Sequence, residues 1–209
     1  MRQKLLAGVM VLPALGLASG LKPIDLPPAQ TSGGKPLMQA LEERKTSREF
    51  STTKLPVQIL SNLLWAAFGV NRPNGHRTAP SAMNHQEIDI YVATADGLYL
   101  YQPDGQRLTA ILSDDLRAAT GTQDFAGTAP VDLVYVADFA KMGGIPLDDK
   151  IFYSAADAGF IGQNVYLYCA SEGLATVVRG SIHRAALAKA MRLRADQRII
   201  LAQTVGYPQ

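Results

Sequence analysis

The amino-acid sequence predicts an α+β fold in which helices flank a central mixed or antiparallel sheet. Three observations lead to this prediction. Helical segments with one apolar face come first, a pair of strands joined by a turn at Asp96-Gly97 follows, and helices then alternate with apolar strands. With 209 residues, 47% of them hydrophobic, the chain can bury one core without disulfides. Its single cysteine excludes a disulfide framework or a cysteine-based zinc site within one chain.

Two helices are expected early in the folded part, each with a proline in its first turn, where the missing N–H removes no hydrogen bond. Pro36 opens the first helix, in which Leu37 and Leu41 form one apolar stripe. Pro56 opens the second over residues 57–68, whose apolar side chains recur at helical spacing.

Five segments are expected to be strands because β-branched or apolar residues dominate them. They are residues 88–94, 98–101, 131–137, 174–178 and 198–205. The segment 131–137 (VDLVYVA) is nearly all apolar, so it is expected to be a central strand. Three further helices are expected: a short one between Ser113 and Gly121, a long apolar one over 154–171 and a short amphipathic one over 183–194.

Residues 1–20 have the pattern of a cleavable export signal, the signal peptide of a secreted protein. Arg2 and Lys4 form a basic start, the uncharged run that follows is too short to span a bilayer, and small residues end the segment. The alternative is an amphipathic or buried first helix. Residues 21–35 contain three prolines and are expected to be an extended linker, which leaves 36–209 as the folded domain. The signal implies a periplasmic or secreted protein without stable membrane insertion; if the signal interpretation is wrong, the protein is expected in the cytoplasm.

Charge and motif content exclude several classes of function. Residues 1–20 hold two of the 20 Lys and Arg residues, so the remainder has 18 basic and 18 acidic residues and no basic surplus for nucleic-acid binding. His76, His85 and His183 do not stand at metal-binding spacing, and the sequence has no glycine-rich nucleotide motif and no G-x-S-x-G elbow. Cys169 is expected to be a buried structural thiol. If the protein is an enzyme, a cofactor is therefore expected to carry the difficult chemical step.

Two polar segments have the composition to hold such a cofactor. Residues 44–50 (RKTSREF) place three cations and two hydroxyls where a helix runs into a loop, and guanidinium groups suit a phosphate. Residues 75–86 (GHRTAPSAMNHQ) combine small residues with amides that match the edge of a heterocycle. The alternatives are a solvated basic helix end for the first segment and an ordinary polar turn for the second.

Four pieces of sequence, in this order, resemble the nitroreductase family of FMN enzymes over nearly all of the presumed mature chain. Residues 44–50 are similar to the family's R-x-S-x-R/K-x-F motif, and residues 80–86 (PSAMNHQ) to its P-S-x-x-N-x-Q loop. Residues 157–173 are similar to its long central helix, and 204–208 (TVGYP) to its G-Y-P ending. The sequence of residues 77–82 (RTAPSA) is similar to that of the family branch that includes azoline dehydrogenases of peptide maturation.

The resemblance implies a layered sandwich that forms a tight homodimer with two FMN sites at the subunit interface, and no metal. Residues near 44–48 would hold the phosphate, the ribityl chain and the pyrimidine edge, while the 80–86 loop would reach the same flavin from the other subunit. The cofactor-binding residues implied are Arg44, Lys45, Thr46 (in the usual serine's place), Arg48, Pro80, Ser81, Ala82, Asn84 and Gln86. Glu172 and Gly173 would be catalytic, with a backbone N–H near N5 of the isoalloxazine to stabilise developing charge.

Two departures from the family pattern accompany the resemblance. Members usually continue past G-Y-P with a basic residue that contacts the phosphate, whereas this sequence ends at Gln209. Arg179 is the candidate for a substitute cation. The stretch 139–150 is short and rich in glycine, so a more open pocket is expected.

The activity implied is a ping-pong transfer of electrons from a reductant to a small organic acceptor. The reductant is NAD(P)H, or a redox partner if the protein is exported, because nicotinamide cofactors are not expected there. Two alternatives stay open: a flavin-binding carrier or sensor without efficient turnover, and a structural descendant of the fold that binds no flavin.

Overall fold

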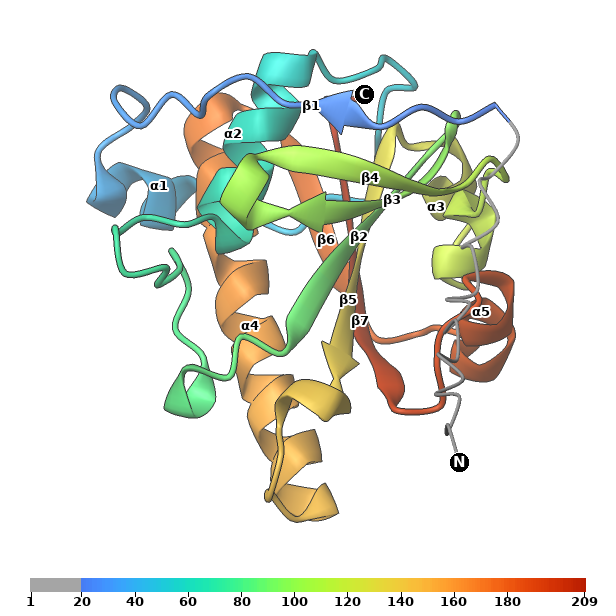
Figure 1. Ribbon diagram of the computed structural model, residues 1–209. Coiled ribbons are helices and arrows are strands. Elements are labelled where there is room, and N and C mark those ends of the chain that lie inside the picture. The colour runs from blue at the N-terminus through green and yellow to red at the C-terminus, as the bar shows by residue number, and fades with distance from the viewer. Residues whose placement is uncertain (1–19) are drawn as a thin grey trace, which may run out of the picture.

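The computed structural model describes residues 20–209 (Figure 1). The predicted export signal lies outside the described residues, apart from Gly20. Within the described part, no helix is long and apolar enough to cross a membrane.

Seven strands form a single sheet in which all neighbouring pairs are antiparallel. Their order across the sheet is β1-β4-β3-β2-β5-β7-β6. In chain order they are β1 (Ile24–Asp25), β2 (Ile88–Thr94), β3 (Gly97–Gln102), β4 (Arg107–Leu112), β5 (Val131–Asp138), β6 (Ala175–Arg179) and β7 (Gln197–Gly206). The α+β prediction is therefore confirmed, with an antiparallel rather than a mixed sheet.

Helices cover both faces of this sheet (Figure 1). They are α1 (Leu37–Glu43), α2 (Val57–Phe68), α3 (Phe125–Thr128), α4 (Leu147–Glu172) and α5 (Arg184–Ala190). Short 3-10 turns occur at Ala82–Asn84, Pro103–Gly105, Arg117–Thr120 and Phe139–Lys141. Buried residues of α2 and α4 pack on one face, and those of α5 pack on the other, which gives three layers.

Strand β5 lies at the centre and every one of its residues is buried. Because successive side chains of a strand point to opposite faces, Leu133 and Tyr135 pack towards α2 and α4, whereas Val134 and Val136 pack towards α5. A strand that is buried on both sides needs apolar residues at nearly all positions, which explains why Asp132 is the one charged residue within 131–137.

All five expected strands are present, with bounds that differ by no more than one residue at each end. The long helix α4 begins at Leu147 rather than at residue 154, and the short helix expected between Ser113 and Gly121 is only a 3-10 turn. Three elements were not expected: β1, β4 and the one-turn helix α3. Each of these is short or lies near the sheet edge, where the pairing partner rather than the strand's own sequence decides the structure.

The expectation that residues 21–35 are only a linker is corrected in part. The segment is extended, but Ile24 pairs with Leu108 of β4 as the edge of the sheet. Leu26 is buried in the core, and the Ser61 hydroxyl of α2 donates to the Pro27 carbonyl. These contacts bind the segment to the domain along its length, so it contributes to stability.

Candidate functional site

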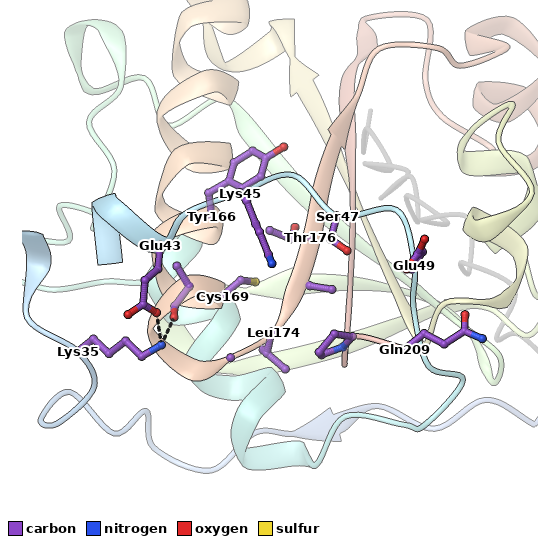
Figure 2. A pocket seen from close by; sticks show the side chains of 14 residues that line it. Lys35, Glu43, Lys45, Ser47, Glu49, Tyr166, Cys169, Leu174, Thr176 and Gln209 are labelled. Carbon is purple, nitrogen blue, oxygen red and sulfur yellow. Dashed lines mark hydrogen bonds and ion pairs between the residues drawn. The ribbon is translucent and has the colours of Figure 1, made fainter. Parts of the chain in front are cut away.

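A cavity of about 590 Å³ lies between the loop after α1, the C-terminal end of α4 and strand β6 (Figure 2). Its lining residues are Lys35, Glu43, Lys45, Ser47, Glu49, Tyr166, Cys169, Ala170, Gly173, Leu174, Ala175, Thr176, Pro208 and Gln209. A volume of this size suits a ligand as large as a mononucleotide, including a flavin nucleotide. The sequence motifs at residues 44–50, 157–173 and 204–208 all contribute to it.

Main-chain contacts attach the loop after α1 to the edge strand β6 and to the segment that follows β7. The Ser47 N–H donates to the Thr176 carbonyl of β6 at 3.0 Å, and the buried Phe50 pairs with Pro208 as an antiparallel bridge. The side chains between these two anchor points are free to face the cavity or the solvent. Apolar Phe50 thus explains why the motif ends in an aromatic residue: it fixes the end of the cation-rich loop.

Tyr166 of α4 connects this loop to the sheet. Its hydroxyl lies 3.0 Å from the Thr46 hydroxyl and accepts the Val178 N–H at 3.0 Å. The Arg44 guanidinium carbon stacks 5.1 Å from the centre of the Tyr166 ring. Tyr166 was missed by the sequence analysis, although its position on the recognised central helix was a usable signal.

Cationic side chains approach the cavity from the N-terminal segment and from the loop. Lys35 donates to the Ala170 carbonyl at 3.0 Å and forms an ion pair with Glu43. Since Ala170 is in the last turn of α4, the ammonium also offsets the partial negative charge at that helix end. Hydrogen bonding from Lys35 lowers the pKa of the Glu43 carboxyl below its usual value. Lys45 has no ion pair within residues 20–209 and points into the cavity (Figure 2).

The N-terminal segment reaches this site because Gly34, which has no side chain, lets the backbone lie close to Ser171 at the end of α4. Gly34 has a positive φ of 76°, and a Cβ there would lie 2.5 Å from the Ser171 hydroxyl. The adjacent Lys35 N–H donates to that hydroxyl at 2.9 Å. Sequence reasoning missed Lys35, because the contact joins residues that are far apart in the chain.

Gly173 lines the cavity where α4 ends, in the left-handed conformation with φ 71°. Its N–H and that of Leu174 both donate to the Cys169 carbonyl. Glu172 is exposed, and its carboxylate accepts from the Ser171 hydroxyl at 3.3 Å. The predicted catalytic pair is thus split, since Gly173 faces the cavity and Glu172 is not among the residues that line it.

The other predicted cofactor residues of the first motif are near the cavity but differ in exposure. Arg44 is half-buried against Tyr166, whereas Thr46 and Arg48 are exposed. Arg48 has no hydrogen bond or ion pair to any described side chain or main-chain atom, so its guanidinium is available for a ligand.

The second motif, residues 80–86, lies elsewhere. The Ala82 N–H donates to the Asp157 carboxylate of α4 at 2.9 Å. Asp157 and Gly173 are sixteen positions apart on the helix, which corresponds to about 24 Å along its axis. One chain therefore does not bring Pro80, Ser81, Ala82, Asn84 and Gln86 to the cavity.

Side chains of this loop are largely engaged with each other. The Gln86 amide donates to the Gly75 carbonyl and to the Asn84 side-chain oxygen, each at 3.0 Å, and accepts from Arg77 at 2.8 Å. The Ser81 hydroxyl accepts the Gln86 N–H at 3.0 Å. Gln86 is therefore a structural part of the loop in the single chain.

Arg179 is not at the cavity, which corrects its assignment as a phosphate contact. Its side chain is 1% exposed and forms an ion pair of 2.6 Å with Asp132. Three further guanidinium N–H groups donate to the carbonyl and hydroxyl of Thr120 and to the hydroxyl of Thr204. Burial raises the pKa of Asp132 to about 7 and lowers that of Arg179. Four of its five N–H donors are used inside the fold and the residue is buried, so Arg179 is not placed to bind a ligand in the cavity.

The cavity-lining cysteine and the described acidic and histidine residues form neither a reactive nucleophile nor a metal site. Cys169 is 1% exposed, and burial raises the pKa of its thiol, so it matches the expected structural thiol rather than a nucleophile. Among residues 20–209, no group of three or more His, Cys, Asp or Glu side chains is placed to hold a metal ion. The arrangement is that of a binding site with cations at its rim.

In a comparison with protein families, the model described as "Nitroreductase family" matches residues 41–207. A solved structure from Ralstonia eutropha, named as a nitroreductase, has 46% identity, a TM-score of 0.87 and 96% coverage of each chain. A protein of Methanocaldococcus jannaschii, also named as a nitroreductase, is 32% identical over 157 residues, which cover 70% of this chain and 79% of that protein.

Two more distant solved structures share the fold alone. The Escherichia coli microcin synthetase McbBCD complex has a chain that is 19% identical, with a TM-score of 0.69, 99% coverage of this chain and 85% of that one. The NADPH:FMN oxidoreductase from Vibrio harveyi is 17% identical, with a TM-score of 0.62, 83% coverage of this chain and 69% of that one.

Proposed function

From the premise that this chain belongs to the nitroreductase family and has a nitroreductase-like oxidoreductase fold, we propose that it is an FMN-dependent oxidoreductase. The cavity at the C-terminal end of α4 is the proposed FMN site. The observation that carries this proposal is the convergence of the cation-rich loop, Gly173 and the G-Y-P ending on one cavity.

The side chains present fit a flavin nucleotide. Lys45 points into the cavity, while Arg44 and Arg48 stand in the same loop, so three cations are within the loop's reach of a phosphate. Thr46 and Ser47 supply hydroxyls for a polyol chain. Gly173 has no atom within 4 Å of the place where a Cβ would be, so a planar ring can approach its backbone closely. Lys45 replaces Arg179 as the proposed additional phosphate contact.

Bound FMN supplies the ability to accept a hydride from a donor and to pass electrons on in a second step, which gives ping-pong kinetics. This chain's residues bind the cofactor, orient its ring against the end of α4 and exclude water from one side. The donor we propose is NAD(P)H or a redox partner, and the acceptor is a small organic molecule. Residues 1–20 are proposed to be an export signal, which would place the protein in the periplasm or outside the cell.

A homodimer is proposed because the 80–86 loop and the cavity lie far apart on one chain. A second copy is needed for the loop to contact a flavin in the cavity. Large apolar side chains are exposed along α1, the first half of α4 and the loop itself, which supports an interface there. These are Leu37, Met38, Leu41, Met83, Leu147, Ile151, Phe152 and Phe160. Met38 is 75% and Phe152 is 67% exposed, values unusual for such residues in a monomer.

The test is an absorbance spectrum of the purified protein, followed by anaerobic addition of NADH or NADPH. A bound-flavin spectrum that bleaches supports the proposed enzyme. Arg48→Ala is expected to weaken FMN binding about tenfold, as the loss of one charge-assisted contact implies. Arg198→Ala, an exposed arginine outside the cavity, is the control. Absence of flavin binding after reconstitution would overturn the cofactor assignment.

A flavin-binding carrier or sensor is the second candidate, and one observation favours it. The Gly173 N–H is committed to the Cys169 carbonyl, so it is not free to stabilise charge on the ring. A flavin spectrum that persists after addition of every donor tested would support this role over turnover. A protein that stays colourless with FMN would leave only the structural role.

A further inference from the structure

Glu87 is a buried carboxyl group without a donor. It is 0% exposed, follows the 80–86 loop directly, and neither carboxylate oxygen has a hydrogen-bond partner in the described chain. A buried carboxylate with no partner is strongly unfavourable, so the group must either hold a proton or find a partner.

Asp157 lies beside Glu87 and is itself only 2% exposed. One Asp157 oxygen accepts the Ala82 N–H at 2.9 Å, a contact that an ionised carboxylate makes best. Two carboxylates at close range in a buried site strongly disfavour being ionised together, so a single shared proton resolves the conflict. The proton belongs on Glu87, which has no other donor, and Glu87 can then donate to Asp157.

The 80–86 loop needs such an external anchor because its backbone is strained. Met83, Asn84 and Gln86 have φ values of 50°, 55° and 50°, in the left-handed region that side chains disfavour. Most side-chain contacts of the loop are internal to residues 75–86. The Asp157 contact ties the loop to α4 and hence to the core.

We infer that Asp157 is a positioning residue for the proposed flavin-contacting loop, and that Glu87 is the proton holder that keeps Asp157 able to anchor it. This inference rests on the proposed function for its consequence, the contact with flavin. When the shared proton is lost, two like charges face each other in the interior and the loop is released. FMN affinity is then expected to fall as pH rises.

Two groups face the pair besides the two carboxyls: the Ser154 hydroxyl, which is buried on α4, and His85 of the loop. The ammonium of Lys141, which follows β5, pairs with Asp89 instead. His85 contacts the Lys141 carbonyl at 3.1 Å, and its positive form would lower the pKa of Asp157. Burial acts in the opposite direction and raises the pKa of both Glu87 and Asp157. The folded state therefore keeps a proton that the unfolded chain releases, and stability falls as pH rises.

The experiment compares the full-length protein with Glu87→Gln, which removes the titration but keeps a donor for Asp157. FMN binding is measured by quenching of flavin fluorescence, from the ordinary glutamate pKa of 4.5 upward to about pH 9. The dissociation constant of the unmodified protein is expected to rise about tenfold, whereas that of Glu87→Gln changes less than about twofold. Asp89→Asn is the control, because Asp89 is a half-buried carboxyl on β2, two residues after Glu87, that already pairs with Lys141 at 2.6 Å.

A second measurement does not depend on flavin. Amide hydrogen exchange is measured over residues 80–86 in FMN-free protein. As pH rises, exchange in the unmodified protein is expected to accelerate more than the intrinsic chemical rate does, because the loop opens. In Glu87→Gln, exchange is expected to follow the intrinsic rate alone. Asp157→Ala is expected to expose the loop at every pH, and Asp157→Asn to restore protection in part, because an amide oxygen still accepts the Ala82 N–H.

The outcomes separate this inference from the proposed function. The same pH dependence of FMN binding and exchange in Glu87→Gln would overturn the proton holder and leave the flavin site intact. No FMN binding by the unmodified protein at any pH would overturn the proposed function, and hydrogen exchange would still decide the anchoring of the loop.

Discussion

Arg179 and Asp132 form an ion pair at 2.6 Å in the interior, where their side chains are 1% and 0% exposed. Asp132 lies on β5 opposite Thr204 of β7, and the Thr204 hydroxyl donates to the same carboxylate oxygen. Thr120 completes the set from the 3-10 turn that precedes α3. The ion pair and its partners thus connect strands β5, β6 and β7 to the 3-10 turn that precedes α3.

Removing one partner is expected to be severely destabilising. Arg179→Met should lower the free energy of unfolding by about 3–5 kcal/mol, because it leaves the Asp132 carboxyl buried without a counter-charge. The double variant Arg179→Met with Asp132→Leu should recover much of this loss. Urea unfolding measures both. A large loss of FMN affinity with unchanged stability would instead restore Arg179 as a cofactor contact.

The segment before α1 is expected to behave as part of the core. Leu26→Ala should lower the free energy of unfolding by about 2–3 kcal/mol, since a buried leucine is removed from a packed cluster. Pro28→Ala, at an exposed position of the same segment, should change it by less than about 0.5 kcal/mol. Equal, small effects in both variants would return the segment to the status of a linker.

Tyr166 is expected to act on stability and cofactor binding together. Tyr166→Phe keeps the ring under Arg44 but removes the hydroxyl that contacts Thr46 and accepts the Val178 N–H. A loss of about 1–2 kcal/mol in unfolding free energy is expected, with FMN affinity reduced several-fold. Tyr153→Phe serves as the matched control on the same helix. Unchanged FMN affinity would mean that the loop does not depend on Tyr166.

One glycine inside α4 and one directly after it should respond in opposite ways to alanine. Gly173→Ala should lower stability by about 1 kcal/mol, because an alanine resists a φ of 71°. Gly159→Ala, at an open position inside the helix, should raise it by about 0.5–1 kcal/mol. Thermal unfolding compares them. If Gly173→Ala is neutral for stability but weakens FMN binding, the glycine is needed for the ligand rather than for the helix end.

Cys169 should react slowly in the native protein. Burial raises the pKa of its thiol, which keeps the reactive thiolate scarce. A thiol reagent such as DTNB is expected to label the unfolded protein at once and the native protein only through opening, and added FMN should slow this further because Cys169 lines the cavity. Rapid labelling of the native protein would contradict the burial.

Much of this protein was determined by local sequence. The apolar periodicity of α2 and of the strands β2, β5 and β7 is strong enough that their bounds follow from it. Strand β4 was missed because its residues RLTAIL are only a modest strand pattern, and its structure depends on pairing with β3 and, at the sheet edge, with β1. Residues 44–50 were recognised as a candidate binding segment because cations and hydroxyls in one short loop are a local property.

Only the tertiary structure decided which polar residues meet. Nothing in the sequence around Arg179 indicates that its side chain is buried. Its burial against Asp132 depends on the register between β5, β6 and β7, which no local pattern contains. Likewise, Lys35 reaches α4 from a distant segment, and Asp157 meets Ala82 across 75 positions of the chain. The reason is physical: local conformation follows from neighbouring residues, whereas the partner of a buried charge is chosen by how the whole chain packs.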